Sequence, residues 1–212
     1  LGSAQFAAET GQTLTHFYSI DRFGSPSDAA ENPALQKIIW NLPPSATNHF
    51  PGKLSLCIGM PVIIRNNNAT ELCITKGQEG HVVGWQSGIG IHGNNVLNTL
   101  FIKLDKPAKI VKIDGLPENV VPISRGSKNI ECTFSSDMKE HIHRSQVWVL
   151  LNFSMTDYTS QGKTRPKNPV DFSNCRSHQS YYTFLSRSAT ASGTVIVQSF
   201  SPRLITCGAS GF

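Results

Sequence analysis

Residues 147–164 decide how the fold of this chain is interpreted, and they read Val147-Trp-Val-Leu-Leu-Asn-Phe-Ser-Met-Thr-Asp-Tyr-Thr-Ser-Gln-Gly-Lys-Thr164. The part up to residue 153 is mainly apolar and strand-like, whereas the rest is small, polar and rich in hydroxyl groups. Backbone N–H groups and hydroxyls at a strand-to-helix turn are suited to contact a phosphate. The pattern therefore predicts a strand at 147–153, followed by a phosphate-contacting turn and a short helix at 155–164.

The residues that follow continue the alternation of strand and helix. The sequence predicts a strand at 169–172, a helix at 177–188 and a strand at 193–200, which is the signature of an α/β fold with a parallel sheet. Within the helix, the spacing of Tyr182, Leu185 and Ala189 predicts the side that faces the core. Arg187 is left near the helix end, and a fixed guanidinium there can neutralise charge on a transferring phosphoryl group. An arginine at a helix C-terminus can equally serve the helix dipole alone.

The middle of the chain has a different character. Helix signals at 3–10 and 33–42 precede it, and short β-rich runs separated by turn residues fill it, at 54–64, 80–85, 100–104, 109–113 and 119–123. Several short strands at this spacing are typical of a small antiparallel barrel. We therefore expect an α/β domain made of 1–57 and 144–212, in which 147–153 and 193–199 share a sheet, interrupted by a barrel at 58–143.

Two groups of residues resemble the motifs of a known family. Thr156, Ser160-Gln-Gly162 and Thr164, followed by Tyr182 and Leu185-Ser-Arg187, resemble motifs V and VI of superfamily 1 DNA helicases, in the RecD-like and PIF-type branch. Two more runs, Leu56–Asn66 and Arg144-Ser-Gln146, look like the family's entry to and exit from an inserted barrel. The stretch Ala69–Gly77 is similar to PIF-type helicases of fungal genomes, some of them in Helitron transposons.

The resemblance implies a fold and a set of roles. The fold would be the second RecA-like domain of a helicase, a parallel-sheet domain of the P-loop NTPase type without its own P-loop, carrying a small antiparallel SH3-like β-barrel. Arg187 would be catalytic as an arginine finger. ATP contacts would come from Gln161, Gly162, Lys163 and Ser186. Contacts to nucleic acid would come from Thr156, Tyr158, Thr159 and Ser160.

The resemblance also implies cofactors and partners. The full-length enzyme would use ATP and Mg²⁺, but this chain alone would bind neither, because the phosphates and the metal belong to a first motor domain. Gly162-Lys163-Thr164 is not a P-loop, since Asp157 stands where that motif needs glycine. The expected partners are single-stranded DNA and the first RecA-like motor domain. Roles in DNA repair and recombination, in the nucleus or the mitochondrion, would follow.

Composition sets limits on these expectations. The chain of 212 residues has a net charge of +5, which is compatible with a polyanionic partner but does not require one. It contains no run of 18 apolar residues, so we expect no membrane span. The five cysteines are an odd number without CxxC spacing, which argues against a disulfide framework or a zinc knuckle. His141 and His143 alternate as on one strand face, but they lack a third metal ligand. The start at Leu1, inside a helix-like pattern, indicates a piece of a longer protein.

Departures from the family pattern keep two alternatives open. Tyr158-Thr159 stands where the family usually has His-Lys, and Phe184 replaces a small residue. The chain could therefore be a non-enzymatic nucleic-acid-binding module descended from a helicase, with salt-dependent DNA binding. It could also be an inactive transposon-derived relic. An in-frame P-loop and acidic pair encoded upstream would favour the helicase.

Overall fold

The structure is a computed structural model whose contacts divide the chain into two compact units, Leu1–Phe153 and Ser154–Phe212. We call them the N-terminal unit and the C-terminal unit and describe each by itself. The residues that the structure describes are 2–23, 33–67, 69–133, 139–153, 162, 164–173, 175, 177–201 and 203. None of the helices in these ranges is long and apolar enough to cross a bilayer.

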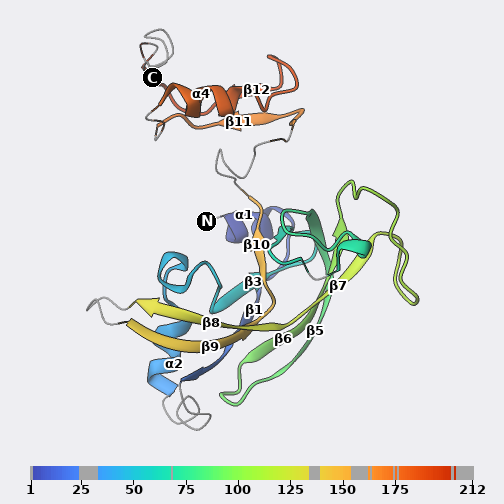
Figure 1. The fold of residues 1–212 in the computed structure, drawn as a ribbon, viewed down its shortest axis with the longest axis vertical. Helices are drawn as coiled ribbons and strands as arrows, with labels where there is room; N and C mark the ends of the chain where they lie inside the picture. Colours follow the sequence, from blue (N-terminus) through green and yellow to red (C-terminus); the bar gives the residue numbers. More distant parts are fainter. Residues whose placement is uncertain are drawn as a thin grey trace. The chain divides into compact units, whose positions relative to one another are not determined.

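The N-terminal unit is built mainly of strands, with short helices around them (Figure 1). Its elements in chain order are α1 (Gly2–Glu9), β1 (Thr15–Tyr18), β2 (Ile20–Phe23), α2 (Pro33–Trp40), η1 (Pro44–Thr47), β3 (Lys53–Leu56), β4 (Pro61–Ile64), η2 (Thr70–Leu72), β5 (Glu79–Ile89), β6 (Asn95–Leu104), β7 (Val120–Ser124), β8 (Gly126–Thr133), β9 (Lys139–Gln146) and β10 (Val149–Leu151).

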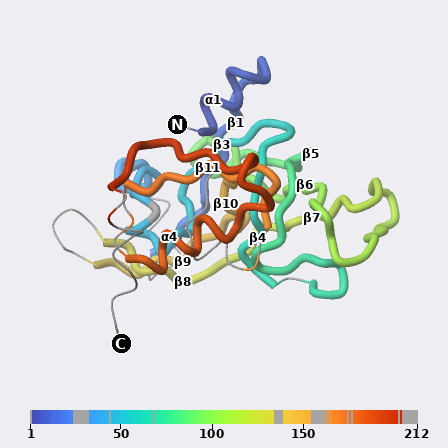
Figure 2. The backbone as a smooth tube through the Cα atoms, turned by 90° about the horizontal axis from the view of Figure 1, so that it is seen from above, coloured from blue at the N-terminus to red at the C-terminus, as the bar shows by residue number. Residues whose placement is uncertain are grey.

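The larger sheet of this unit has five antiparallel strands in the order β10-β4-β5-β6-β7. The hairpin of β5 and β6 is its longest part, with 11 and 10 residues. On β6, Leu100, Ile102 and Leu104 alternate with more exposed residues, so one face of the strand enters the main core. Figures 1 and 2 show β5, β6 and β7 side by side, with the loop between β6 and β7 projecting away from them.

The smaller sheet has the order β2-β9-β8, and it shares a second core with α2. This core joins Ile39 of α2 to Ile130 and Cys132 of β8 and Ile142 of β9. A separate pair, β1 with β3, completes the strands of the unit. Its Phe17 and Leu56 pack in the main core with the five-stranded sheet.

A fully buried ion pair links the smaller sheet to its surroundings. Arg144 of β9 and Asp21 of β2 both have side chains with 0% exposure, and the Arg144 Nε atom lies 2.8 Å from Asp21 Oδ1. Arg144 also donates from Nη1 to the carbonyl oxygen of Phe50 at 2.7 Å, and from Nη2 to that of Ile39 at 3.4 Å. Asp21 accepts further hydrogen bonds from Ser19 Oγ and Gln36 Nε2. The pair therefore joins β2, β9 and α2 through one buried hydrogen-bond network.

The C-terminal unit is a strand-helix-strand unit. Its elements are β11 (Asn168–Val170), α4 (His178–Leu185) and β12 (Thr194–Ile196), and β11 pairs with β12 in parallel. Val170, Phe172 and Tyr181 form its core. The predicted alternation of strand, helix and strand in this region is confirmed, and the chain is an α/β protein with mixed sheets and few helices.

Several expectations need correction. No closed barrel is present within the described ranges, where the strands between 58 and 143 belong to an open five-stranded and an open three-stranded sheet. The expected strand at 109–113 is a loop, whereas β1, β2, β8 and β9 were not expected as strands. The expectation that 147–153 shares a sheet with 193–199 is wrong, because β10 pairs with β4 and β12 with β11.

The side of α4 that faces the core is also corrected. Tyr182 is 68% exposed and Ala189 is exposed, whereas Tyr181 is only 2% exposed and packs against Phe172 with ring centres 4.9 Å apart. The core side is thus set by Tyr181, Phe184 and Leu185 at i, i+3, i+4 spacing. Because Tyr181 and Tyr182 are adjacent, the sequence pattern allows either of them to face the core. Packing against the ring of Phe172 places Tyr181 there.

Candidate functional site

The end of α4 carries the two sequence-predicted site residues Ser186 and Arg187. The helix begins after Ser177, whose Oγ accepts a hydrogen bond from the backbone N–H of Ser180 at 3.2 Å. It ends at Leu185, where the backbone N–H of Ser186 donates to the carbonyl oxygen of Tyr182 at 2.8 Å. A helix of fixed start and length sets where Arg187 leaves it.

The guanidinium of Arg187 lies against the last turn of the helix. Its Nε donates to the carbonyl oxygen of Thr183 at 3.2 Å, and its Nη2 donates to Ser186 Oγ at 3.0 Å. The last carbonyl groups of a helix have no partner within it, so an arginine at this position satisfies one of them. These two bonds hold the guanidinium against the helix end.

The segment after Thr164 is fixed to the end of this helix. The backbone N–H of Arg165 donates to the carbonyl oxygen of Arg187 at 2.7 Å, and that of Ala189 donates to the carbonyl oxygen of Arg165 at 2.9 Å. These bonds form a parallel bridge between Arg165 and Ser188. The structure therefore brings the downstream end of the first predicted motif next to the end of the second.

Asn168 strengthens this junction. Its side-chain Nδ2 donates to the carbonyl oxygen of Phe184 at 2.8 Å and to Ser188 Oγ at 2.9 Å, and the residue is 8% exposed. A buried amide that binds a helix end from the neighbouring strand holds both in one arrangement. The sequence reasoning missed Arg165 and Asn168, and no local signal marks them, because their partners lie about 20 residues further along the chain.

Of the remaining predicted site residues, the structure describes Gly162. Gly162 is exposed and has φ of 76°, in the left-handed region that favours glycine. Gln161, Lys163, Thr156, Tyr158, Thr159 and Ser160 lie outside the described residues. Their ATP and nucleic-acid contacts therefore stay predictions.

An open hollow of about 500 Å³ lies beside the end of α4. Its lining carries the hydroxyl groups of Ser188, Thr190 and Thr194, together with apolar side chains, and no charged side chain. Hydroxyl groups can bind phosphate oxygens. They do not suit Mg²⁺, which is usually held through carboxylates. Across the described ranges, no group of three or more His, Cys, Asp or Glu side chains could hold a metal.

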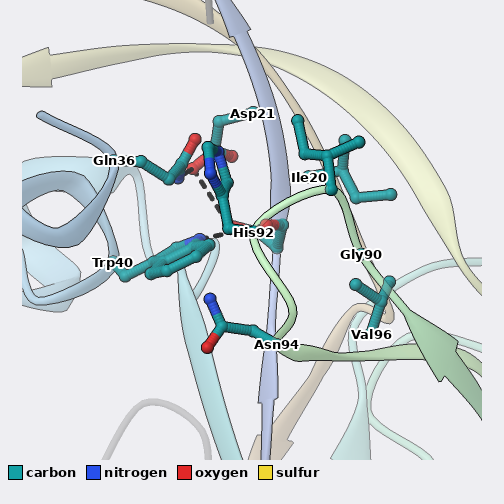
Figure 3. Close-up of a pocket in the computed structure, with 10 residues that line it drawn as sticks. Ile20, Asp21, Gln36, Trp40, Gly90, His92, Asn94 and Val96 are labelled. Carbon is teal, nitrogen blue, oxygen red and sulfur yellow. Dashed lines mark hydrogen bonds between the residues drawn. The ribbon is translucent and has the colours of Figure 1, made fainter. Parts of the chain in front are cut away.

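A second, more enclosed pocket lies in the N-terminal unit, where the tip of the β5–β6 hairpin meets β2 and α2 (Figure 3). His92 at the tip packs its ring edge against Trp40, with ring centres 5.9 Å apart. Trp40 Nε1 donates to the carbonyl oxygen of Ser19 at 3.0 Å, and Asp21 lines the wall. The cavity measures about 20 Å³, which is room for a single water molecule. It is therefore a joint between elements rather than a ligand site.

Comparisons with known proteins fit this geometry. No protein-family model and no curated protein matches the chain. Among solved structures, the fold is that of part of a Pif1 helicase. The Pif1 helicase of Candida albicans is 18% identical with a TM-score of 0.60, and the match covers 96% of this chain and 44% of that one. The Bacteroides Pif1 helicase in complex with ADP-AlF3 and ssDNA is 17% identical with a TM-score of 0.58, covering 95% and 39%.

The Bacteroides Pif1 bound to ssDNA gives a similar result, with 16% identity, a TM-score of 0.58, and coverage of 94% of this chain and 40% of that one. The chain thus spans about two fifths of the length of the Pif1 structures that it matches. The resemblance inferred from the two motifs is confirmed at the level of the fold.

Proposed function

We propose that this chain is the C-terminal portion of an ATP-dependent DNA helicase of the PIF type. The observation that carries the proposal is the parallel bridge of Arg165 with Ser188, the residues directly after the two predicted motifs, within a fold similar to that of Pif1 helicases. The C-terminal unit belongs to the second RecA-like domain of the enzyme. The strands of 58–143 correspond to its inserted SH3-like domain.

In the full-length enzyme, ATP and Mg²⁺ are held by the first motor domain, and this chain completes the site. Arg187 exchanges its bonds to Thr183 and Ser186 for bonds to the γ-phosphate. Gln161 and Gly162 sense the nucleotide, while Thr156 and Ser160 contact the backbone of single-stranded DNA. Closure of the cleft then moves the DNA contacts relative to the first domain. Nuclear location and a part in DNA repair or recombination belong to the same proposal.

The test is Arg187→Ala in a full-length enzyme that includes the first motor domain. Loss of an arginine finger typically lowers turnover by about a thousandfold or more. We expect steady-state ATP hydrolysis to fall by that order, while binding of single-stranded DNA is kept. Arg187→Lys should rescue poorly, because lysine lacks the planar fork. The matched control is Lys167→Ala, which removes an exposed positive charge from the same unit.

The outcome that would contradict the proposal is specific. If Arg187→Ala lowers the melting temperature while ATP hydrolysis per folded molecule is unchanged, the arginine only stabilises the last turn of α4. A full-length protein that binds DNA but never hydrolyses ATP would instead favour the non-enzymatic binding module.

A further inference from the structure

A third pocket, which we call the Trp148 pocket, lies within the N-terminal unit. It is lined by Phe50, Asn66, Gly126, Ser127, Lys128 and Trp148 and encloses about 100 Å³. Its walls come from the chain just after β4, from the start of β8 and from the residues between β9 and β10. In the same measure one water molecule needs about 10–15 Å³, so the space is several times larger. It has room for a small tetrahedral anion.

The lining of the pocket carries a positive charge and no negative one. It contains a lysine, an amide and a hydroxyl, but no carboxylate. The Nζ atom of Lys128 lies 4.5 Å from the centre of the Trp148 ring, and Lys128 makes no ion pair with the described part of the chain. Phe50 packs on the same indole with ring centres 5.1 Å apart. A lysine whose only charge partner is an aromatic face is available to an anion.

Two donors at this place have no acceptor. Trp148 Nε1 and Arg65 Nε are both buried, and neither has a hydrogen-bond partner within the described ranges. The two residues are neighbours, because the backbone N–H of Arg65 donates to the carbonyl oxygen of Trp148 at 3.3 Å. Buried donors are nearly always paired in folded proteins. Neither donor atom opens into the pocket, but together they leave an excess of donors over acceptors beside a carboxylate-free lining, which favours an anion there.

We propose that the Trp148 pocket is a binding subsite for a phosphate group, with Lys128 supplying the charge, Asn66 and Ser127 supplying hydrogen bonds, and the Trp148 ring forming part of the wall. Side chains of these types are the ones that contact phosphates in complexes with nucleic acids. The phosphate comes either from the backbone of a nucleic-acid strand or from a free nucleotide. The subsite belongs to the N-terminal unit and uses none of the residues at the end of α4, so it stands or falls independently of the proposed motor role.

The test follows the indole N–H signals of the whole 212-residue chain by ¹⁵N-correlated NMR. The three tryptophans give three such signals, which Trp→Phe variants assign. Sodium phosphate, a nucleoside monophosphate and a short single-stranded DNA are added separately, with sodium chloride keeping the ionic strength constant. We expect the Trp148 signal to move and saturate. The Trp40 signal should stay, because its N–H is bound to Ser19 inside the protein.

A charge-removing variant separates a subsite from general attraction to a basic protein. Lys128→Gln should raise the dissociation constant obtained from the Trp148 titration about tenfold, which is the value of one charge-assisted hydrogen bond. Lys109→Gln, which removes an exposed lysine elsewhere in the unit, should leave it unchanged. Ser127→Ala is the second variant if Lys128→Gln fails to fold, and it should weaken the response in the same direction.

The outcomes divide as follows. A response to DNA alone identifies a strand phosphate as the ligand, whereas a response to the monophosphate or to inorganic phosphate as well identifies a subsite for phosphate in general. Both support the proposal. It is overturned if the Trp148 signal stays fixed with all three probes, if sodium chloride alone reproduces the shift, or if the folded lysine or serine variant responds like the unaltered chain.

Discussion

At the scale of single residues, the buried pair of Arg144 and Asp21 is the most consequential contact. The resemblance of the sequence predicts Arg144 at the exit from an inserted domain but gives it no task. The structure shows that it satisfies Asp21 and the carbonyl oxygens of Phe50 and Ile39. A charge in this position is stable only while its partner is present, because neither side chain is exposed to solvent.

We predict that Asp21→Asn lowers the free energy of unfolding by about 3–5 kcal/mol, the usual cost of leaving one member of a buried pair without its partner. Urea denaturation followed by circular dichroism measures it. Replacing both partners, by Asp21→Leu with Arg144→Met, should restore part of the loss. Glu118→Gln is the control, because its pair with Lys112 is exposed and spans 4.0 Å. Equal stability of Asp21→Asn and the unaltered chain would contradict the role of the pair.

The buried cysteines give a second prediction at this scale. Burial raises the pKa of the Cys57 and Cys132 thiols, and the thiolate is the form that reacts. Both folded pKa values lie above the unfolded ones, so the fold favours the neutral thiols. Their burial is compatible with full stability below about pH 9, and stability is lost as pH rises through the folded pKa values. At pH 8 we expect alkylation of both residues only in denaturant, as located by mass spectrometry. Labelling of either one in the native chain at the rate of a small-molecule thiol would disprove it.

At the scale of elements, the sequence predicts best where the signals are local. Ser177 caps α4, and the apolar runs around it become β11 and β12. The strands β8 and β9 escape prediction because much of their length is exposed and polar, so that residues such as Lys128 and Glu140 mask the alternation of their buried partners. The apolar run at 109–113 is not a strand, since only Val111 is buried there and no strand in the described part of the chain pairs with it.

At the candidate site, too, the sequence predicts the local features but not the contacts between elements. The sequence predicts the helix and the place of Arg187 at its end, because both depend on residues close in the chain. It does not predict that the guanidinium folds back on Thr183 or that Asn168 holds the helix end. Those contacts depend on how β11 packs beside α4, and packing between elements has no local signature.

We predict that Gly193→Ala destabilises the parallel pair of β11 and β12. A Cβ atom at Gly193 would overlap the carbonyl oxygen of Pro166, while the carbonyl oxygen of Gly193 accepts the backbone N–H of Asn168 at 2.8 Å. Overpacking of this kind costs about 1–3 kcal/mol. Hydrogen exchange of the Asn168 amide measures the effect, and its protection should fall.

Gly84→Ala is the matched control for this change. The nearest atom to its Cβ would be Phe101 Cδ2 at 3.9 Å, which is ordinary contact. We expect that variant to keep full protection of its own sheet. Unchanged protection of Asn168 in Gly193→Ala would mean that the parallel pair does not depend on this close approach.

At the scale of the whole molecule, each unit contains its own core, and the net charge is +5. We predict that the purified chain binds single-stranded DNA weakly, with an affinity that falls linearly on a double-logarithmic plot against salt. It should show no ATP turnover, because the sequence has no P-loop. Fluorescence anisotropy at several salt concentrations and a phosphate-release assay measure the two. ATP hydrolysis that a motif substitution abolishes would show that the nucleotide site is misplaced.

The distance along the chain between Asp21 and Arg144 has a consequence for folding during synthesis on the ribosome. The two residues are 123 positions apart, and among the described residues β9, which carries Arg144, is the sole strand paired with β2. A ribosome that adds about 5–20 residues per second makes the arginine about 6–25 s after the aspartate. During that interval β2 has no β9 strand with which to pair. A nascent chain paused before residue 144 therefore has an unpaired β2 strand, which is the kind of exposed edge that favours aggregation and that chaperones protect.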